Sequence, residues 1–320
     1  MSNKTLLEIN NLVTEFHTED GIVKAVNDVS FSLNKGETIG IVGESGSGKS
    51  VTSLSVMQLI QSPPGRISNG EILFHSENGT VDLLKCTKQE MRNYRGNDIA
   101  MIFQEPMTSL NPVFTCGEPV SEAIILHQKV TRKTAKSLTI ELFKQVELPR
   151  PGAIFDAYPH QISGGQKQRV MIAMAMSCNP SVLIADEPTT ALDVTVQKTI
   201  LELMLQLQQK HDMGILFITH DLGVIAELAD KVVVMYKGKI VEQGNVKDIF
   251  TNPQHPYTKG LLACRPPLNR RLTWLPTVAD FMTIDESGRM HETNKSVADV
   301  TNSLVISPEE TAKRHESIYK

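Results

Sequence analysis

The chain has 320 residues, of which 40% are hydrophobic and 21% are charged. This composition can bury a core and excludes wholesale disorder. Aromatic residues make up only 5%, and the formal net charge is -4, which argues against a protein whose whole surface grips nucleic acid. We expect no nucleic-acid partner, and the length predicts one large domain or a large domain with an appendage.

The cysteines and the apolar runs indicate the cellular compartment in which the protein works. Four cysteines, Cys86, Cys116, Cys178 and Cys264, lie far apart without a CxxC pair, which predicts reduced thiols in a cytosolic protein. The stretch from Met1 to Val13 has no signal-peptide core, and no apolar run approaches the roughly 18 to 20 residues that span a bilayer. We therefore expect a protein that does not cross a membrane by itself.

The N-terminal part of the chain alternates short strands and turns. Apolar positions from Leu7 to Val13 and from Val23 to Leu33 predict two strands. Residues 38–42 predict a short buried strand that runs into a glycine-rich loop. Helical spacing follows from Val51 to Ile60, and Pro63-Pro64-Gly65 stops that helix.

The rest of the chain predicts a parallel sheet with helices. Residues 85–175 are helix-rich. Buried strands are predicted at 181–185 and 214–219, an amphipathic helix at 195–211 and a hairpin at 231–243. Strands that alternate with helices imply a mainly parallel sheet that is covered on both faces. Beyond Pro253 the pattern decays into a polar, irregular appendage.

The glycine-rich loop fits the pattern GxxxxGK[ST]. Its backbone N–H groups can wrap a triphosphate, and the following helix points its positive end at the phosphates. We expect Lys49 to reach the β- and γ-phosphates and the Ser50 hydroxyl to bind Mg²⁺. The alternative is a chance match, but the strand before the loop and the helix after it favour nucleotide binding. The expected ATP-binding residues of this loop are Gly43, Glu44, Ser45, Gly46, Ser47, Gly48, Lys49, Ser50 and Val51.

Two acids and a histidine follow the later strands. Asp186 can hold Mg²⁺ through its water shell, and Glu187 is placed to orient and activate the attacking water. His220 can hydrogen-bond the γ-phosphate. Alone, the acids would be read as a solvated strand end and the histidine as structural. Beside a phosphate loop, the functional interpretation is favoured.

A second anion-binding helix start is predicted at Ser163-Gly164-Gly165. One chain has little use for two such loops around one triphosphate, whereas two chains placed head to tail can use both. The alternative is an ordinary helix cap by Ser163.

Together, and in this order, these residues resemble the ATP-binding cassette (ABC) family over roughly residues 5 to 250. The matched segments are the Walker A loop at 43–50, the Q-loop glutamine Gln104, the family-defining Ser163-Gly164-Gly165-Gln166 after Ile162 where leucine is usual, Walker B at Asp186-Glu187, the D-loop Ala191-Leu192-Asp193 and the switch His220. The resemblance implies an α/β fold: a P-loop NTPase (RecA-like) core with an antiparallel β-subdomain and an inserted helical subdomain at about 104–165. It also implies an ATPase domain at 1–255 and a C-terminal extension at 256–320.

The resemblance further implies residue roles. Glu187, His220, Gln104 and Lys49 would be catalytic, and Mg²⁺ would be held by Ser50, Gln104 and, through water, Asp186. The residues that would contact ATP bound to a facing subunit are Ser163, Gly164, Gly165, Gln166 and Asp193. Phe16 is a candidate to stack on adenine, with plain core packing as the alternative.

A narrower resemblance is to the oligopeptide, dipeptide and nickel importer subfamily. It is carried by residues 104–112, 158–163 and 252–259. It implies ATP hydrolysis that powers uptake of peptides or a similar small solute, at the cytoplasmic face of the inner membrane. The implied partners are a second ATPase subunit (a homologue or a copy), two transmembrane permease subunits and an extracytoplasmic solute-binding protein.

Alternatives to peptide import remain open. The chain could serve an importer of nickel or glutathione-type solutes, an exporter, or a soluble cassette ATPase in DNA repair or translation. The last is disfavoured because the sequence has one cassette and no heptad run. Some subfamily tails bind an iron–sulfur cluster, but only Cys264 falls in this tail, so we expect no cluster.

Overall fold

The computed structural model describes residues 4–104, 109–190, 192–264, 277–278, 281–284 and 290–292. The chain divides into two compact units, residues 1–240 and 241–320. Part of the subfamily segment at 104–112, the D-loop residue Ala191 and most of the C-terminal extension lie outside the described residues.

The first unit contains a six-stranded sheet in the order β10-β9-β3-β8-β7-β6. Neighbouring strands from β9 to β6 run parallel, as the alternation of strands and helices predicts. The first strand in this order, β10, begins in the first unit and passes into the second. The strands are β3 (Thr38–Val42), β6 (Ile99–Ile102), β7 (Val182–Asp186), β8 (Gly214–Ile218), β9 (Lys231–Tyr236) and β10 (Lys239–Asn245).

A second, four-stranded sheet has the order β2-β1-β4-β5, and its neighbours are antiparallel. It corresponds to the predicted antiparallel subdomain, although the sequence patterns indicated only its first two strands. The strands are β1 (Thr5–Thr18), β2 (Gly21–Asn34), β4 (Gly65–Ser76) and β5 (Gly79–Asp82).

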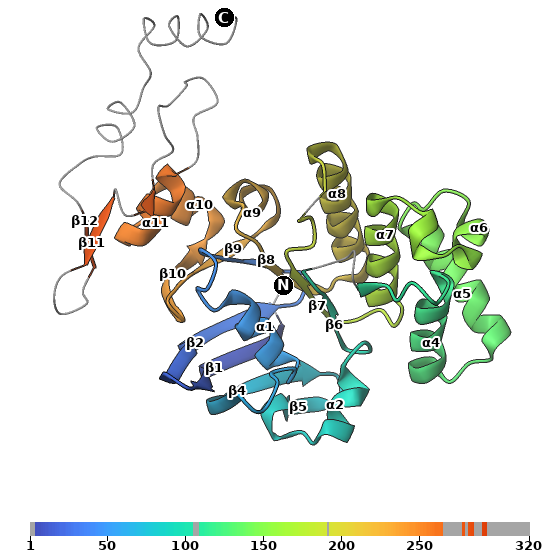
Figure 1. The fold of residues 1–320 in the computed structure, drawn as a ribbon, viewed down its shortest axis with the longest axis horizontal. Coiled ribbons are helices and arrows are strands. Elements are labelled where there is room, and N and C mark those ends of the chain that lie inside the picture. Colours follow the sequence, from blue (N-terminus) through green and yellow to red (C-terminus); the bar gives the residue numbers. More distant parts are fainter. Residues whose placement is uncertain are drawn as a thin grey trace, which may run out of the picture. The chain divides into compact units, whose positions relative to one another are not determined.

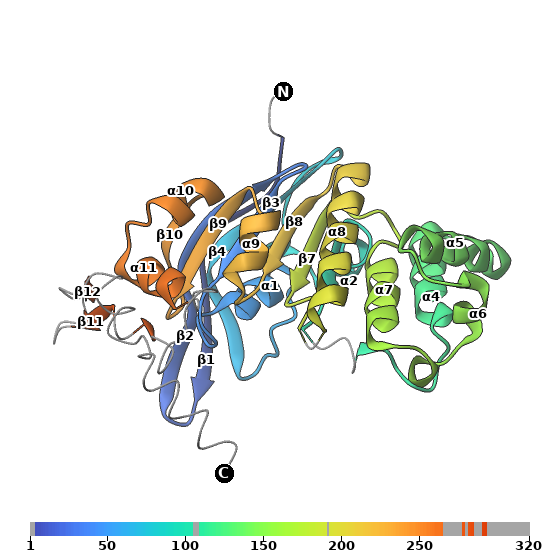
Figure 2. The same ribbon diagram turned by 90° about the horizontal axis from the view of Figure 1, so that it is seen from above.

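Helices surround the sheets of the first unit. Figures 1 and 2 show α4, α5 and α6 as a group beside α7, with α8 and α9 packed along the parallel strands. The helices are α1 (Lys49–Val56), α2 (Lys88–Tyr94), α4 (Gly117–Gln128), α5 (Arg132–Gln145), α6 (Pro151–Asp156), α7 (Gly164–Ala175), α8 (Val194–His211) and α9 (Leu222–Leu228), with single 3₁₀ turns at Leu83–Lys85 and Pro159–Gln161.

The alternation of side chains along β3 explains how the layers pack. Ile39 and Ile41 are buried in a core that also contains residues of the antiparallel sheet and Val56 of α1. Gly40 faces the opposite way, where a Cβ atom would lie 2.7 Å from the Ile225 side chain of α9. One face of the parallel sheet therefore packs on α1 and the second sheet, and the other face packs on helices.

The helix after the phosphate loop is shorter than the sequence predicts. The apolar pattern continues to Ile60, but α1 ends at Val56, and Gln58 has a left-handed φ of 47°. Arg95 explains this end, because its Nε and Nη2 atoms donate to the carbonyl oxygens of Met57 at 2.7 Å and Gln58 at 2.9 Å. These carbonyl groups are satisfied by a side chain rather than by a further helical turn.

In the second unit, the motif at 252–259 forms a compact turn before a helix. The Glu242 carboxylate accepts hydrogen bonds from the backbone N–H groups of Gln254 at 2.7 Å and His255 at 3.0 Å. His255 caps the next helix by accepting from the N–H of Tyr257 at 3.1 Å, and Tyr257 is fully buried. The elements of this unit are α10 (Val246–Thr251), α11 (Pro256–Ala263), β11 (Met282–Ile284) and β12 (Met290–Glu292).

Candidate active site

The predicted phosphate loop follows β3 and is held in a conformation that requires glycine. Gly43 and Gly48 have φ angles of 152° and 103°. A Cβ atom at Gly43 would lie 2.2 Å from the Met235 carbonyl oxygen, and one at Gly48 would lie 2.3 Å from the Ala25 carbonyl oxygen. The loop backbone therefore passes too close to its neighbours for any side chain at these two positions.

Lys49 is buried at the start of α1 and folds back over the loop. Its Nζ atom donates to the carbonyl oxygens of Gly43 at 2.7 Å and Glu44 at 2.9 Å. Burial lowers the pKa of Lys49, while the nearby Glu187 and Asp186 carboxylates oppose that shift. The ammonium group thus bonds the loop carbonyl groups and lies within electrostatic reach of both acids.

Asp186 ends β7 inside the protein, with 3% of its surface exposed. The Ser50 hydroxyl donates to its Oδ1 atom at 3.1 Å. Burial raises the pKa of Asp186 to about 6, although the hydrogen bond from Ser50 opposes the shift. A hydroxyl and a buried carboxylate are hard oxygen donors of the kind Mg²⁺ prefers, and a cation would offset the burial of the charge. This pair of residues therefore fits a magnesium ion.

Three hydrogen bonds converge on the carboxylate of Glu187. Its Oε2 atom accepts from Thr190 Oγ1 at 2.9 Å and from Gln104 Nε2 at 3.2 Å. Its Oε1 atom lies 3.2 Å from His220 Nδ1. Burial raises the pKa of Glu187, but the hydrogen bonds from Thr190 and His220 and the charges nearby outweigh it, so that the pKa lies below its ordinary value. Glu187 is therefore an ionised acceptor.

These groups meet because parallel strands place their carboxyl ends at one edge of the sheet. A cavity of about 420 Å³ at this edge is lined by the phosphate loop, Gln104, Glu187 and His220. The structure thus brings together the residues predicted to bind and hydrolyse ATP on one chain. Thr190 was not predicted, and its only sequence signal is a hydroxyl residue three positions after the acid.

The second predicted cluster lies in a different pocket. A cavity of about 400 Å³ is lined by residues that include Ser163, Gly164, Gly165, Gln166 and Asp193. Ser163 forms a capping box with Gln166, and Asp193 caps α8 by accepting from the N–H of Val196 at 2.9 Å. Within one chain, Ser163 thus acts as an ordinary helix cap, which was the alternative to a role in ATP contact. It does not line the cavity that contains Lys49.

Phe16 lies on β1, half-buried, and pairs in register with Val23 and Gly65. A Cβ atom at Gly65 would lie 2.9 Å from its ring. Phe16 does not belong to the described residues that line the Lys49 cavity, so adenine stacking by Phe16 stays a prediction. Among the described residues, no helix is long and apolar enough to span a bilayer.

Comparison with known proteins identifies the family. Residues 26–190 match the model of the ABC transporter family. The chain belongs to the ABC transporter family. A second model, for the C-terminal region of oligopeptide/dipeptide transporters, matches residues 241–287 of this ABC protein.

Relatives of this ABC protein include importer components. The oligopeptide transport ATP-binding protein OppD of Bacillus subtilis is 51% identical over 287 residues, which cover 88% of this chain and 79% of the relative. The glutathione import ATP-binding protein GsiA of Pectobacterium atrosepticum is 50% identical, over 90% of this chain and 46% of that longer protein. A solved dimeric ATP-binding cassette with ADP and phosphate superimposes with a TM-score of 0.66 at 26% identity, over 75% of this chain and 99% of that one.

These comparisons confirm the predicted cassette fold and the ATPase activity. The ABC protein described here binds a nucleotide and hydrolyses ATP. The roles of individual residues, the metal ion and the identities of the partners stay predictions, which the geometry makes specific.

Proposed function

We propose that this chain is the ATP-hydrolysing subunit of an ABC importer that takes up peptides or a related small solute. Two relatives with about 50% sequence identity are named as oligopeptide transport and glutathione import ATP-binding proteins. The C-terminal match to peptide-transporter proteins supports the same class of solute. The chain would work at the cytoplasmic face of the membrane, peripherally, with permease subunits that supply the channel.

The observation that carries the ATP-hydrolysing part of the proposal is the geometry around Glu187. The phosphate loop and Lys49 would bind the phosphates. Ser50, Gln104 and Asp186 would hold Mg²⁺, whose charge would neutralise that of the phosphates. The ionised Glu187 orients a water molecule and accepts its proton as the oxygen attacks the γ-phosphorus. His220, 3.2 Å from Glu187, donates to the γ-phosphate oxygens and stabilises the developing charge.

A complete site would need two subunits. The cluster of Ser163 to Gln166 lines its own cavity, apart from the one that contains Lys49. In a head-to-tail pair, the start of α7 in one subunit contributes N–H groups to the triphosphate held by the other. ATP binds the closed pair better than the open pair and therefore shifts the equilibrium toward closure. Hydrolysis removes this preference, and the pair opens again. The second subunit is a homologue or a copy.

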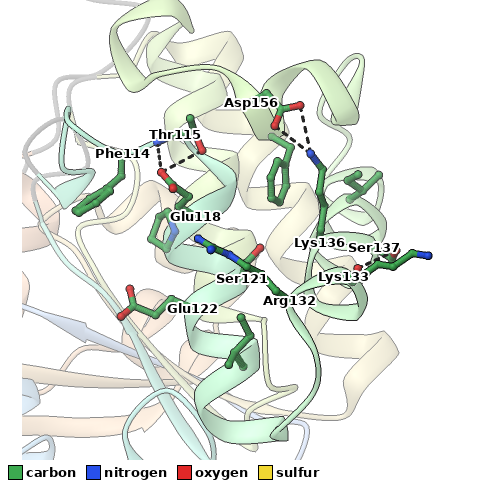
Figure 3. Close-up of a pocket in the computed structure, with 14 residues that line it drawn as sticks. Phe114, Thr115, Glu118, Ser121, Glu122, Arg132, Lys133, Lys136, Ser137 and Asp156 are labelled. Carbon is green, nitrogen blue, oxygen red and sulfur yellow. Dashed lines mark hydrogen bonds and ion pairs between the residues drawn. The ribbon is translucent and has the colours of Figure 1, made fainter.

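A pocket in the helical group is the proposed contact with the permease. It lies between α4, α5 and α6 and has a volume of about 1100 Å³. Phe114 and Phe155 are apolar members of its wall. Glu118 on α4 and Arg132 on α5 also line it, and the Glu118 carboxylate accepts from the Thr115 N–H at 2.8 Å (Figure 3). An apolar wall with charges of both signs around it suits a short amphipathic helix better than a small anion.

The first experiment would identify the partners. The chain is tagged in its own cell, membranes are solubilised gently, and the proteins that co-purify are identified. We expect two multi-span proteins, a second cassette subunit and a solute-binding protein that reveals the solute. Recovery of ribosomes, DNA or no membrane protein would overturn the importer assignment and leave a soluble cassette ATPase.

The second experiment tests the site and its contact in that purified complex. Glu187→Gln should retain ATP binding and lose turnover by roughly 100-fold or more, whereas Glu227→Gln on the exposed surface of α9 should stay active. Near-normal hydrolysis by Glu187→Gln would refute its role. Phe114→Ala should reduce recovery of the permease without changing ATP affinity. The matched change Leu138→Ala, outside the pocket lining, should have no effect on recovery.

A further inference from the structure

The carboxylate of Glu187 receives hydrogen bonds from two kinds of group. Gln104 and His220 reach it from the ends of other strands, and both line the nucleotide cavity. Thr190 reaches it from the same turn of chain, three residues later. Under the proposed function, Gln104 is a ligand of the metal and His220 bonds the γ-phosphate. Gln104 can therefore exchange Glu187 for the metal and His220 can exchange it for the γ-phosphate, whereas no contact with either is predicted for Thr190.

The turn that carries Thr190 is firmly placed. Glu187 has a left-handed φ of 47°. Its N–H group donates to the Ile218 carbonyl oxygen at 2.9 Å, and its carbonyl oxygen accepts from the Thr190 N–H at 3.2 Å. The Thr190 hydroxyl closes the same turn through the side chain, at 2.9 Å from Oε2. The backbone of Glu187 is thus fixed by bonds to Ile218 and Thr190, and its side chain is fixed by the Thr190 hydroxyl.

We propose that Thr190 is a positioning residue for ATP hydrolysis, which holds Oε2 of Glu187 so that Oε1 faces the cavity and accepts the proton of the attacking water. The inference rests on the proposed role of Glu187. Without the hydroxyl, the carboxylate rotates about its terminal torsion once Gln104 binds the metal and His220 binds the γ-phosphate. A base that is correctly oriented for only a fraction of the time slows the chemical step but leaves nucleotide binding unchanged.

The test uses the complex that co-purifies with the chain. Thr190→Val keeps the shape and removes the hydroxyl, and Thr190→Ser keeps the hydroxyl. We expect Thr190→Val to lower kcat by roughly 5- to 30-fold with KM for ATP within about twofold of wild type, and Thr190→Ser to restore most of kcat. Thr251→Val is the matched control, because this exposed hydroxyl also closes a local bond, to the Lys247 carbonyl oxygen at 2.8 Å, in the second unit.

A double variant separates positioning from a general structural effect. If Thr190 acts through Glu187, adding Thr190→Val to Glu187→Gln should change the residual turnover by less than about twofold. A full further loss in the Glu187→Gln background, a Thr190→Ser variant as slow as Thr190→Val, or an unchanged kcat in Thr190→Val would each overturn the proposal. If Glu187→Gln itself retained normal turnover, the proposed function of the site would fail instead.

Discussion

Arg169 offers a quantitative test of how helix α7, which begins after Ser163, is held in place. It lies on α7, six residues after Ser163, and its side chain is only 15% exposed. Its Nη1 atom donates to the Val146 carbonyl oxygen at 2.6 Å, where α5 ends, and lies 3.1 Å from Glu147 Oε2. One guanidinium group therefore joins the middle of α7 to the end of α5.

The two contacts of Arg169 should differ in energy. A hydrogen bond from a charged group to a carbonyl oxygen contributes about 1.5–3 kcal/mol. The Glu147 carboxylate is 61% exposed, and an ion pair with such a partner contributes about 0.2–1 kcal/mol. Arg169→Met, which keeps the apolar stem, should thus lower the free energy of unfolding by about 2–4 kcal/mol. Glu147→Gln should lower it by less than about 1 kcal/mol.

Differential scanning calorimetry of the full chain measures the difference. At about 1.5 °C per kcal/mol for a chain of 320 residues, Arg169→Met should lower Tm by about 3–6 °C and Glu147→Gln by less than about 1.5 °C. Salt near 1 M should remove most of the Glu147 effect and little of the Arg169 effect. Equal losses in the two variants, or an Arg169 effect that salt abolishes, would show that the ion pair and not the carbonyl contact holds the helix.

Three further predictions concern the loop, the helical group and the edge of the parallel sheet. Lys49→Ala should weaken ATP binding by at least about tenfold in equilibrium titrations, because a charge-assisted phosphate contact is lost; unchanged affinity would contradict that role. Gly117→Ala should lower Tm, since its Cβ would lie 2.3 Å from the Phe155 ring and overpacking costs about 1–3 kcal/mol. Burial raises the pKa of Asp98, so the free energy of unfolding should fall as pH rises through the range above about 4. Asp98→Asn should remove that fall. Its Tm should therefore exceed that of wild type at pH 7 and equal it at pH 3. An equal Tm difference at both pH values would refute burial of the carboxylate as the cause.

Much of the site was predictable because each component ends a strand that the sequence makes visible. The apolar runs at β3, β7 and β8 are short and unbroken, and the chemical groups follow directly after them. Parallel strands then bring Lys49, Asp186 and His220 together without any knowledge of side-chain contacts. Gln104 was found only through the resemblance, since the four residues of β6 give a weak pattern.

The parts that escaped prediction depend on tertiary contacts. The early end of α1 follows from Arg95, which lies almost forty residues away in the sequence and leaves no periodic signal near Gln58. In the pocket between α4, α5 and α6, the position of Phe155 involves its close approach to Gly117. Thr190 acts through a turn whose form is set by the left-handed conformation of Glu187, and an apolar pattern does not encode that conformation.

The hydrogen bonds of Lys49 and Gln104 indicate how ATP could act on the helical group. Lys49 bonds loop carbonyl groups, and Gln104 bonds Glu187, so these two side chains have protein partners. Under the proposed mechanism, ATP exchanges these bonds for phosphate and metal contacts nearly one for one, which keeps the exchange small in free energy. Gln104 lies two residues after β6, and the sequence runs from it to Phe114, which lines the pocket proposed to contact the permease. Its change of partner is therefore the step that can convert the presence of the γ-phosphate into movement of the helical group.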